Sequence, residues 1–234
     1  MDKKGILYPV GTPIGNLKDI TLRALEILKG VDLIASEDTR HTRKLLSHYD
    51  IHIPLTSFSE HNEIRRVPYL IRRLKDGANV ALVSKAGMPG ISDPGYSLIK
   101  EAVKEGITIV PIPGPTALIV GLVASGLPTH SFVFEGFLGR KKGNRIKKLT
   151  RLKEEERTII IYEAPHRVRS VLSEIREVLG DREMTVGREL TKKFEEILRG
   201  RVSEIEKILE ERKPRGEFTL VIQGKRYKGV NAAI

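Results

Sequence analysis

The sequence predicts an α/β fold made of two α/β domains. Short apolar runs of strand length alternate with amphipathic helical stretches almost from one end of the chain to the other. A cluster of three prolines and a glycine at 111–115 interrupts this alternation near the middle. The 234 residues suffice for two domains. We therefore predict an N-terminal domain at 1–114 and a C-terminal domain at 115–234.

The first half contains four apolar runs of strand length. We predict strands at 6–8, 31–35, 80–83 and 107–112, and 80–83 has the uninterrupted apolar pattern of a strand buried in a parallel sheet. Repeated alternation of strands and helices predicts parallel pairing with right-handed crossovers. The helices between the strands are predicted from apolar residues at helical spacing: Ile20, Ala24, Ile27 and Leu28; Leu45 and Leu46; Leu98, Ile99, Ala102 and Val103.

The alternation restarts after the proline cluster. Small residues at 117–125 predict a helix, and strands are predicted at 131–134, 158–162, 183–187 and 218–222. Two further helices are predicted from apolar stripes, one with Val168, Val171, Leu172, Ile175 and Leu179, the other with Val202, Ile205, Ile208 and Leu209.

The composition excludes several classes of function. The chain has no cysteine, which excludes disulfides, thiolate zinc sites, iron–sulfur clusters and a cysteine nucleophile. It has no His-Glu-x-x-His motif, and we expect no metal ion. No apolar run approaches the ~20 residues that span a bilayer, so we expect a cytoplasmic protein without membrane contact. A single glutamine beside abundant Lys, Arg and Glu suggests a thermophilic source.

The charge of the chain favours a polyanionic partner. There are 41 lysines and arginines against 30 acidic residues, a net charge of +11. A solvated helix face usually interleaves both signs, but one segment carries cations only. This basic run predicts a surface for a polyanion such as RNA, with a solvated helix face as the alternative. Between Gly136 and Lys153 it holds eight cations and no acid: Arg140, Lys141, Lys142, Arg145, Lys147, Lys148, Arg151 and Lys153.

Glycines gather in three loops, 10–16, 84–95 and 113–117. In an open parallel sheet, ligands bind at the carboxyl ends of the strands, and glycine there lets backbone amides approach a ligand. A plain turn is the alternative for each loop taken singly. None of the loops matches the Walker phosphate loop or the Gly-x-Gly-x-x-Gly dinucleotide motif, which disfavours ATPases and NAD-dependent enzymes.

Nine short motifs follow one another along the chain. They are Val10–Asn16, Ser36–Arg40, Ser59–Glu63, Gly87 with Asp93–Gly95, Pro113–Ala117, Ser125–Pro128, Phe134–Leu138, Tyr162–Arg167 and Arg188–Lys192. Together they resemble the ribosomal RNA small-subunit methyltransferase I family. The resemblance implies S-adenosylmethionine-dependent methylation of a cytidine ribose 2′-hydroxyl in 16S ribosomal RNA of the small subunit. It also implies a homodimer, and two α/β domains of tetrapyrrole-methylase type with a cofactor cleft between them.

The resemblance also implies which residues bind the cofactor. In relatives of this fold, the loop after the third long strand holds the methionine portion, and its residues here are Ala86, Gly87, Met88 and Ile91. The other contacts that it implies are Ile14, Thr116, Ala117, Glu163, Leu190, Phe218 and Thr219. Two residues depart from the family pattern, which has Asp in place of Lys85 and Thr in place of Met88.

Methyl transfer to a ribose hydroxyl needs alignment of the acceptor and a general base, because this hydroxyl is a weak nucleophile at neutral pH. Asp38 follows a predicted strand, and His61 and Glu63 lie in a polar block at the start of a helix. We expect these three residues to act as the base or to position the acceptor. A helix cap is the alternative for the polar block.

A further group of cations is expected near phosphate. Arg40 follows Asp38, while Arg188 and Lys192 follow a predicted strand, where structural ion pairs are the alternative. The predicted RNA-binding residues are therefore Arg40, Arg140, Lys141, Lys142, Arg145, Lys147, Lys148, Arg151, Arg188 and Lys192.

Two other functions remain open at this point. A tetrapyrrole methylase of the corrin or sirohaem type would use the same cofactor, and its planar polycarboxylate substrate would also suit a basic cleft. The second alternative is an RNA-binding assembly factor that does not catalyse a reaction.

Overall fold

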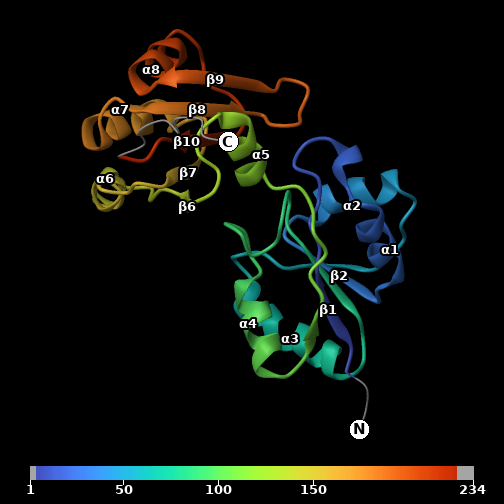
Figure 1. The fold of residues 1–234 in the computed structure, drawn as a ribbon. Helices are drawn as coiled ribbons and strands as arrows, with labels where there is room; N and C mark the ends of the chain where they lie inside the picture. The colour runs from blue at the N-terminus through green and yellow to red at the C-terminus, as the bar shows by residue number, and fades with distance from the viewer. Residues whose placement is uncertain (1–3, 226–234) are drawn as a thin grey trace. The chain divides into compact units, whose positions relative to one another are not determined.

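The computed structural model describes residues 4–225 (Figure 1). The chain divides into two compact units between Thr116 and Ala117, directly after the proline cluster. We call them unit 1 (up to Thr116) and unit 2 (from Ala117). Each unit contains one five-stranded sheet with helices on both faces.

The sheet of unit 1 is entirely parallel, as the strand–helix alternation predicts, with the order β3-β2-β4-β1-β5. All its carboxyl ends therefore lie along one edge. The strand β3 was not predicted, because its three residues are too few for a recognisable pattern. The strands are β1 (Ile6–Pro9), β2 (Leu33–Ser36), β3 (Leu55–Ser57), β4 (Val80–Val83) and β5 (Thr108–Ile109).

Helices cover both faces of this sheet (Figure 1). Val80 and Leu82 of β4 pack with the core residues of α3 and α4, while Ala81 and Val83 pack with those of α1 and α2. Burial on both faces explains the uninterrupted apolar sequence of β4. The helices are the short 3-10 helix η1 (Leu17–Asp19), α1 (Leu22–Gly30), α2 (Thr39–His48), α3 (Glu63–Lys75) and α4 (Tyr96–Lys104).

The sheet of unit 2 is mixed, and here the expectation of parallel pairing is wrong. Its order is β6-β7-β10-β8-β9, in which β6 and β7 are parallel and the other neighbours are antiparallel. The reason is the hairpin between β8 and β9, whose second strand was not predicted. The strands are β6 (Phe132–Phe137), β7 (Thr158–Glu163), β8 (Glu183–Arg188), β9 (Glu196–Arg201) and β10 (Phe218–Ile222).

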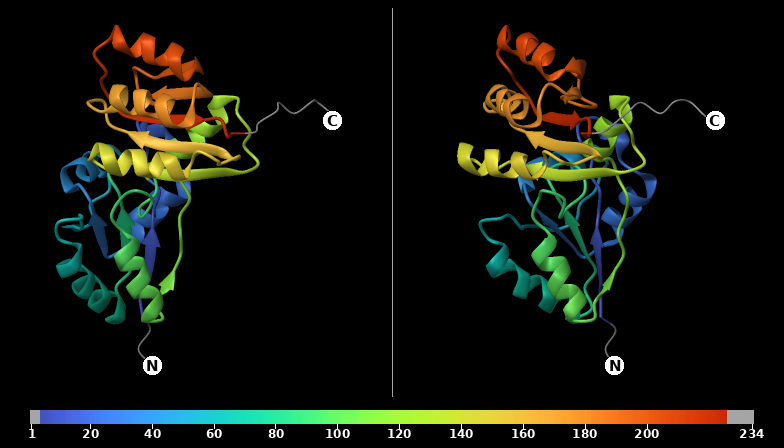
Figure 2. Two further views of the ribbon diagram at one scale, coloured as in Figure 1. Left: turned by 90° about the vertical axis from the view of Figure 1, so that its left-hand side faces the viewer. Right: turned by 60° about the vertical axis from the view of Figure 1, so that its left-hand side comes forward.

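Three helices cover one face of this sheet and α5 covers the other, which Figure 1 and Figure 2 both show. On the α5 side, Leu122 packs with Ile160 and Val221. A Cβ on Gly121 would lie 2.7 Å from the Thr219 methyl carbon, so this glycine allows α5 to approach β10 closely. None of the helices within residues 4–225 is long and apolar enough to cross a bilayer. The helices are α5 (Ala117–Ser125), α6 (Lys142–Arg151), α7 (Val168–Leu179) and α8 (Val202–Glu210).

Candidate functional site

The three glycine loops of unit 1 come together at the carboxyl edge of its sheet. Thr12 and Gly87 exchange two backbone hydrogen bonds of 2.9 and 3.0 Å. Gly11 and Gly114 touch so closely that a Cβ on Gly11 would lie 2.6 Å from the Gly114 Cα. The same Cβ would lie 2.7 Å from Met88 Sδ, so the thioether packs over Gly11. The loops are therefore parts of one joined structure rather than three separate turns.

Gly87 lies at the centre of the predicted cofactor loop. Its φ of +81° is in the left-handed region that favours glycine. A Cβ at this position would meet Ile14 Cγ2 and the Pro115 carbonyl oxygen at 3.6 Å each. Ile91 is exposed and Ala86 is partly exposed. The predicted contacts Ile14, Ala86 and Gly87 thus lie together on one loop surface that is open to solvent in part.

A polar hollow of about 470 Å³ lies at the same edge of the sheet. It is formed by the loops that follow β2, β3 and β4, which are neighbours in the sheet. It brings together two polar blocks that are about twenty residues apart in the sequence, and adds Lys85 from the glycine loop. We call it the polar hollow; its lining residues are Glu37, Asp38, Thr39, Arg40, Ser57, Ser59, Glu60, His61 and Lys85.

Asp38 is the N-cap of α2, a role that the sequence did not indicate for it. Its Oδ1 accepts hydrogen bonds of 3.0 Å from the backbone amides of Arg40 and His41. These bonds, that from His41 above all, lower the pKa of the Asp38 carboxyl group. A carboxylate with a lowered pKa is a weaker general base. Asp38 therefore suits the positioning of a partner better than proton abstraction.

His61 and Arg40 are exposed and line the polar hollow, but Glu63 does not. Glu63 Oε2 accepts a 2.8 Å hydrogen bond from Ser97 Oγ and so links α3 to α4. Asn62 is the N-cap residue of α3 but makes no side-chain cap bond to the helix; its Oδ1 instead accepts from the Ser59 amide at 2.9 Å. We therefore remove Glu63 from the candidate catalytic residues, because its carboxylate belongs to the contact between two helices.

Lys85 connects the cofactor loop with the polar hollow. Its backbone amide donates a 2.9 Å hydrogen bond to Glu37 Oε2, which ties the ends of β4 and β2 together. Its side chain lines the hollow beside Glu37, Asp38 and Glu60. The sequence shows that Lys85 belongs to the glycine loop after β4. It does not show that Lys85 lies beside Glu37 and Asp38, because that depends on β2 and β4 being neighbours in the sheet.

Three of the cofactor contacts predicted in unit 2 are hydrophobic or hydroxyl residues with buried side chains. Leu190, Phe218 and Thr219 are each less than a tenth exposed, and Leu190 packs against Gly187 and Gly121. Any cofactor contact of these three residues would therefore involve main-chain atoms. Ala117 begins α5 at the start of this unit.

Glu163 is also buried, at the end of β7. Its Oε1 accepts from the Ala164 amide at 2.7 Å and forms an ion pair of 2.6 Å with Arg167. Its Oε2 is buried and, among the residues that the structure describes, has no hydrogen-bond partner. An unsatisfied buried carboxylate oxygen is costly unless something else supplies a donor. Glu163 is therefore suited to accept a hydrogen bond from a ligand.

The basic run is divided by the fold into cations that point outward and cations that are paired. Most of the basic run lies on the helix α6. Arg145 is buried and forms an ion pair with Glu174, and Lys148 pairs with Glu135 at 2.9 Å. Because acids from other elements hold these two side chains, we no longer propose them for RNA contacts. Exposed cations remain on and around the helix: Arg140, Lys141, Lys142, Lys147, Arg151 and Lys153.

Arg188 and Lys192 are held in structural ion pairs. Arg188 pairs with Glu196 across the β8–β9 ladder at 2.9 Å. Lys192 Nζ lies 2.8 Å from both Glu189 and Glu217. Structural ion pairs therefore describe these two cations better than phosphate contacts do. We remove both from the proposed RNA-binding residues. Within residues 4–225, no group of three or more His, Asp or Glu side chains is arranged to hold a metal ion.

Comparison with known proteins identifies the family of this chain. Residues 6–206 match the model of the family described as Tetrapyrrole (Corrin/Porphyrin) Methylases. The ribosomal RNA small subunit methyltransferase I of Thermotoga maritima is 51% identical over 94% of this chain and 99% of its own length. That of Bacillus subtilis is 50% identical over 97% of this chain and 78% of its own. This chain belongs to the ribosomal RNA small subunit methyltransferase I family, within the tetrapyrrole methylases.

Two solved structures share the fold of this family member. Cobalt precorrin-4 methyltransferase CbiF superposes with a TM-score of 0.69 at 20% identity, covering 93% of this chain and 94% of its own. Diphthine synthase superposes with a TM-score of 0.69 at 16% identity, covering 94% of this chain and 90% of its own. At such identities the likeness concerns the fold only.

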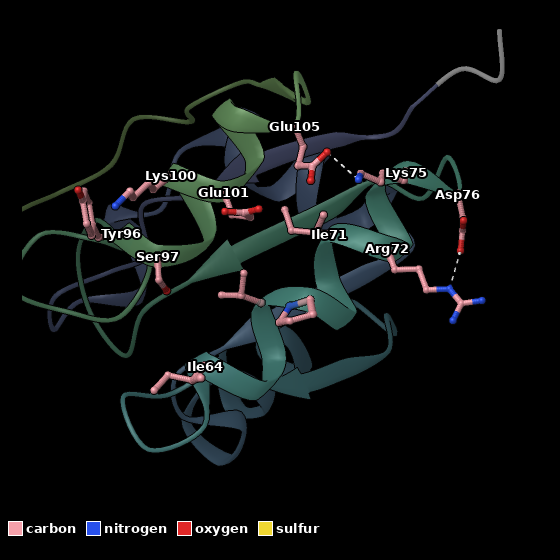
Figure 3. A pocket seen from close by; sticks show the side chains of 12 residues that line it. Ile64, Ile71, Arg72, Lys75, Asp76, Tyr96, Ser97, Lys100, Glu101 and Glu105 are labelled. Atoms are coloured by element: carbon pink, nitrogen blue, oxygen red, sulfur yellow. Dashed lines mark ion pairs between the residues drawn. The ribbon is translucent and has the colours of Figure 1, made fainter.

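This member of the methyltransferase I family has a second, larger hollow of about 780 Å³ between α3 and α4 (Figure 3). Ile64 and Tyr96 are exposed at one end, and the ion pair Lys75–Glu105 (2.6 Å) lies toward the other. Ile71 contributes to its apolar wall. Its lining includes no residue predicted for the cofactor, the acceptor or RNA, so we assign the site to the loops and the polar hollow instead.

Proposed function

We propose that this methyltransferase transfers a methyl group from S-adenosylmethionine to the ribose 2′-hydroxyl of a cytidine in 16S ribosomal RNA. The observation that carries the proposal is the identity of about half the residues, over nearly the whole chain, with relatives named ribosomal RNA small subunit methyltransferase I. The polar hollow beside the glycine loops supports it, because it places potential acceptor-binding groups next to the predicted cofactor loop.

The chain's residues fit S-adenosylmethionine in two places. In unit 1, Ala86 and Met88 flank Gly87 at the carboxyl end of β4, where Thr12 holds the backbone of Gly87, and the absence of a Cβ at Gly87 leaves space beside Ile14. In unit 2, Glu163 offers an unsatisfied buried oxygen. The bound cofactor would supply an electrophilic methyl group on its sulfonium.

His61 is our choice for the general base, with Asp38 and Arg40 positioning the acceptor nucleotide. His61 lines the polar hollow from an exposed position, whereas the N-cap bonds of Asp38 lower its pKa. A positioned histidine is the side chain most often used for proton abstraction in enzymes. The Arg40 guanidinium, exposed at the same hollow, is suited to a phosphate of the RNA backbone.

The exposed cations of α6 are the proposed docking surface for the RNA backbone. Lys141, Lys142, Lys147 and Arg151 are all exposed, and none of the four has an ion-pair partner among the described residues. Phosphate contacts of this kind provide affinity without reading sequence.

We further propose that the protein acts as a homodimer in the cytoplasm, where small ribosomal subunits are found.

The function is tested by mass spectrometry of small-subunit ribosomal RNA from cells with and without this protein. We expect one 2′-O-methylated cytidine to disappear without the protein and to return when purified protein and S-adenosylmethionine are added to the subunits. Unchanged RNA, with an absorbance shift on adding a tetrapyrrole, would favour the corrin or sirohaem alternative. RNA binding without any S-adenosylmethionine binding would favour the assembly factor.

Gly87→Ala should weaken S-adenosylmethionine binding at least tenfold, because the added Cβ enters the space beside Ile14 that the cofactor needs. Gly90→Ala is the matched control. Gly90 lies in the same loop with φ +83°, and its Cβ would also have its nearest contact at 3.6 Å. Both variants should lose about 1 kcal/mol of stability from backbone strain, so thermal melting should not distinguish them. Calorimetry that finds equal cofactor affinity in the two variants would refute the assignment of Gly87.

Lys85→Asp combined with Met88→Thr should tighten cofactor binding severalfold. S-adenosylmethionine carries a net charge of +1 at neutral pH, so an ammonium group in this loop opposes it and a carboxylate favours it. In a solvated site this is worth roughly 1 kcal/mol, or about fivefold in affinity. Lys44→Asp, which makes the same charge change on α2, is the control and should leave the affinity unchanged in calorimetry. Weaker binding in the double variant would mean that Lys85 contacts the cofactor productively.

A further inference from the structure

The hairpin between β8 and β9 exposes an aromatic ring that the proposed site does not use. Phe194, in the turn at 189–195, is 65% exposed. Phe137 is also exposed, but its ring packs against Tyr162. Across residues 4–225, no other aromatic ring packs against Phe194. Single exposed apolar side chains such as Leu22 and Val123 are common on protein surfaces, so exposure alone does not assign Phe194 a partner; its surroundings do.

The turn that carries Phe194 is held in place by polar contacts rather than by burial of the ring. Glu189 and Thr191 have φ values of +49° and +65°, which non-glycine residues seldom adopt. Lys192 bridges Glu189 and Glu217 at 2.8 Å each. Strained backbone of this kind persists only where surrounding contacts enforce it, and it gathers at functional sites. The turn therefore holds Phe194 in a defined position while leaving its ring exposed.

A cation accompanies the ring. Lys193 Nζ lies 5.7 Å from the centroid of the Phe194 ring, and the lysine is itself exposed. The neighbouring cations Arg188 and Lys192 are occupied by acids, so Lys193 is the lysine of this turn whose charge is available to a partner. An exposed aromatic ring beside a cation is the combination with which proteins bind unpaired nucleotides: the base stacks on the ring and the cation attracts the phosphate.

We propose that Phe194 stacks on a base of an unpaired segment of the RNA substrate, with Lys193 attracting the adjacent backbone. This inference rests on the proposed function, since it adds a contact to the same substrate. It assigns the hairpin a role distinct from that of α6. The helix contributes charge and no stacking, while the hairpin contributes a stacking contact and one charge.

The inference predicts a specific dependence on the aromatic ring. Phe194→Leu keeps an apolar side chain but removes the ring, and should weaken binding of a single-stranded RNA oligonucleotide about tenfold. Phe194→Tyr keeps the ring and should bind within about twofold of the unaltered protein. Because stacking involves no counterion release, the slope of log affinity against log salt should be unchanged in Phe194→Leu. Thermal melting checks that the variants fold, and sedimentation checks their oligomeric state.

A fluorescence measurement tests the stacking directly. The chain has no tryptophan, so Phe194→Trp introduces a single indole at the turn. Saturating RNA should quench its emission strongly. Tyr96→Trp is the matched control, because Tyr96 is 69% exposed on α4, has Lys100 Nζ 5.9 Å from its ring centroid and lies outside the proposed site. Its emission should not change, and equal quenching at both positions would overturn the inference.

The outcomes separate this inference from the function on which it rests. If the unaltered protein binds no RNA, the proposed function and the inference both fail. If it binds RNA but Phe194→Leu binds equally well, or the emission of Trp at 194 is unaffected by saturating RNA, the inference alone fails. A changed oligomeric state with unchanged RNA affinity would overturn it too, and would assign the ring to a protein contact.

Discussion

Glu174→Ala is expected to destabilise unit 2 by about 3–5 kcal/mol, the cost of leaving a buried charge without its partner. Arg145 and Glu174 have side chains only 8% and 4% exposed, joined by two hydrogen bonds of 2.7 and 2.5 Å. The hydrogen bonds that Arg145 donates to Glu174 raise the pKa of Arg145 above its ordinary value, so the arginine stays charged. Its third contact, to the Arg140 carbonyl oxygen at 2.7 Å, is too little to compensate the lost carboxylate.

Denaturant unfolding measures this loss. The control is Lys104→Ala, which removes an exposed ion pair with Glu101 on α4 and should cost no more than about 1 kcal/mol. Replacing Arg145 and Glu174 together by Met and Leu should restore much of the stability, because no unpaired charge then remains. A Glu174→Ala variant as stable as Lys104→Ala would contradict the burial of this pair.

Replacing Lys141, Lys142, Lys147 and Arg151 with alanine should reduce the salt dependence of RNA binding by about three in the log–log slope, if each cation contacts one phosphate. The affinity at low salt should fall by orders of magnitude, while cofactor binding stays unchanged. Arg145 and Lys148 are left intact, because their charges are held by Glu174 and Glu135 within the fold.

The measurement is a salt titration of RNA affinity. Its control is a variant with the same loss of charge elsewhere, in which four exposed cations of α1 and α4 become alanine: Arg23, Lys29, Lys100 and Lys104. This control should weaken binding only slightly and keep the slope. If both variants lower the slope equally, the effect is one of net charge, and α6 is a solvated helix face.

Most secondary structure could be predicted from the sequence, since it depends on local apolar spacing. The strands β4 and β10 and the helix α5 lie at the residues predicted, 80–83, 218–222 and 117–125. Two strands escaped prediction. β3 has only three residues, and β9 has two adjacent apolar residues without alternation, so neither carries a readable period.

Strand direction in unit 2 was beyond sequence reasoning. Apolar spacing indicates that a segment is buried, but it is the same whether the segment runs parallel or antiparallel to its neighbour. β10 runs antiparallel to both of its neighbours, β7 and β8, because β9 turns back along β8 before α8 leads into β10. Because β9 was not predicted, the predicted strands and helices of this half alternated in the same way as those of the first half.

The sequence by itself determined the family, the glycine loops and the polar blocks, because these are short motifs whose chemistry depends on residue type and local spacing. Only the tertiary structure decided which of the polar side chains are available. Glu174 is 29 residues from Arg145 in the chain, so the basic run looked free of counter-charges that the fold in fact supplies. Asp38 became a helix cap, Glu63 a link between helices, and Lys85 a neighbour of the acidic block. The physical reason is that a charge or a hydrogen-bonding group is satisfied by whatever lies within about 3 Å in space, and strand order and helix packing set that distance.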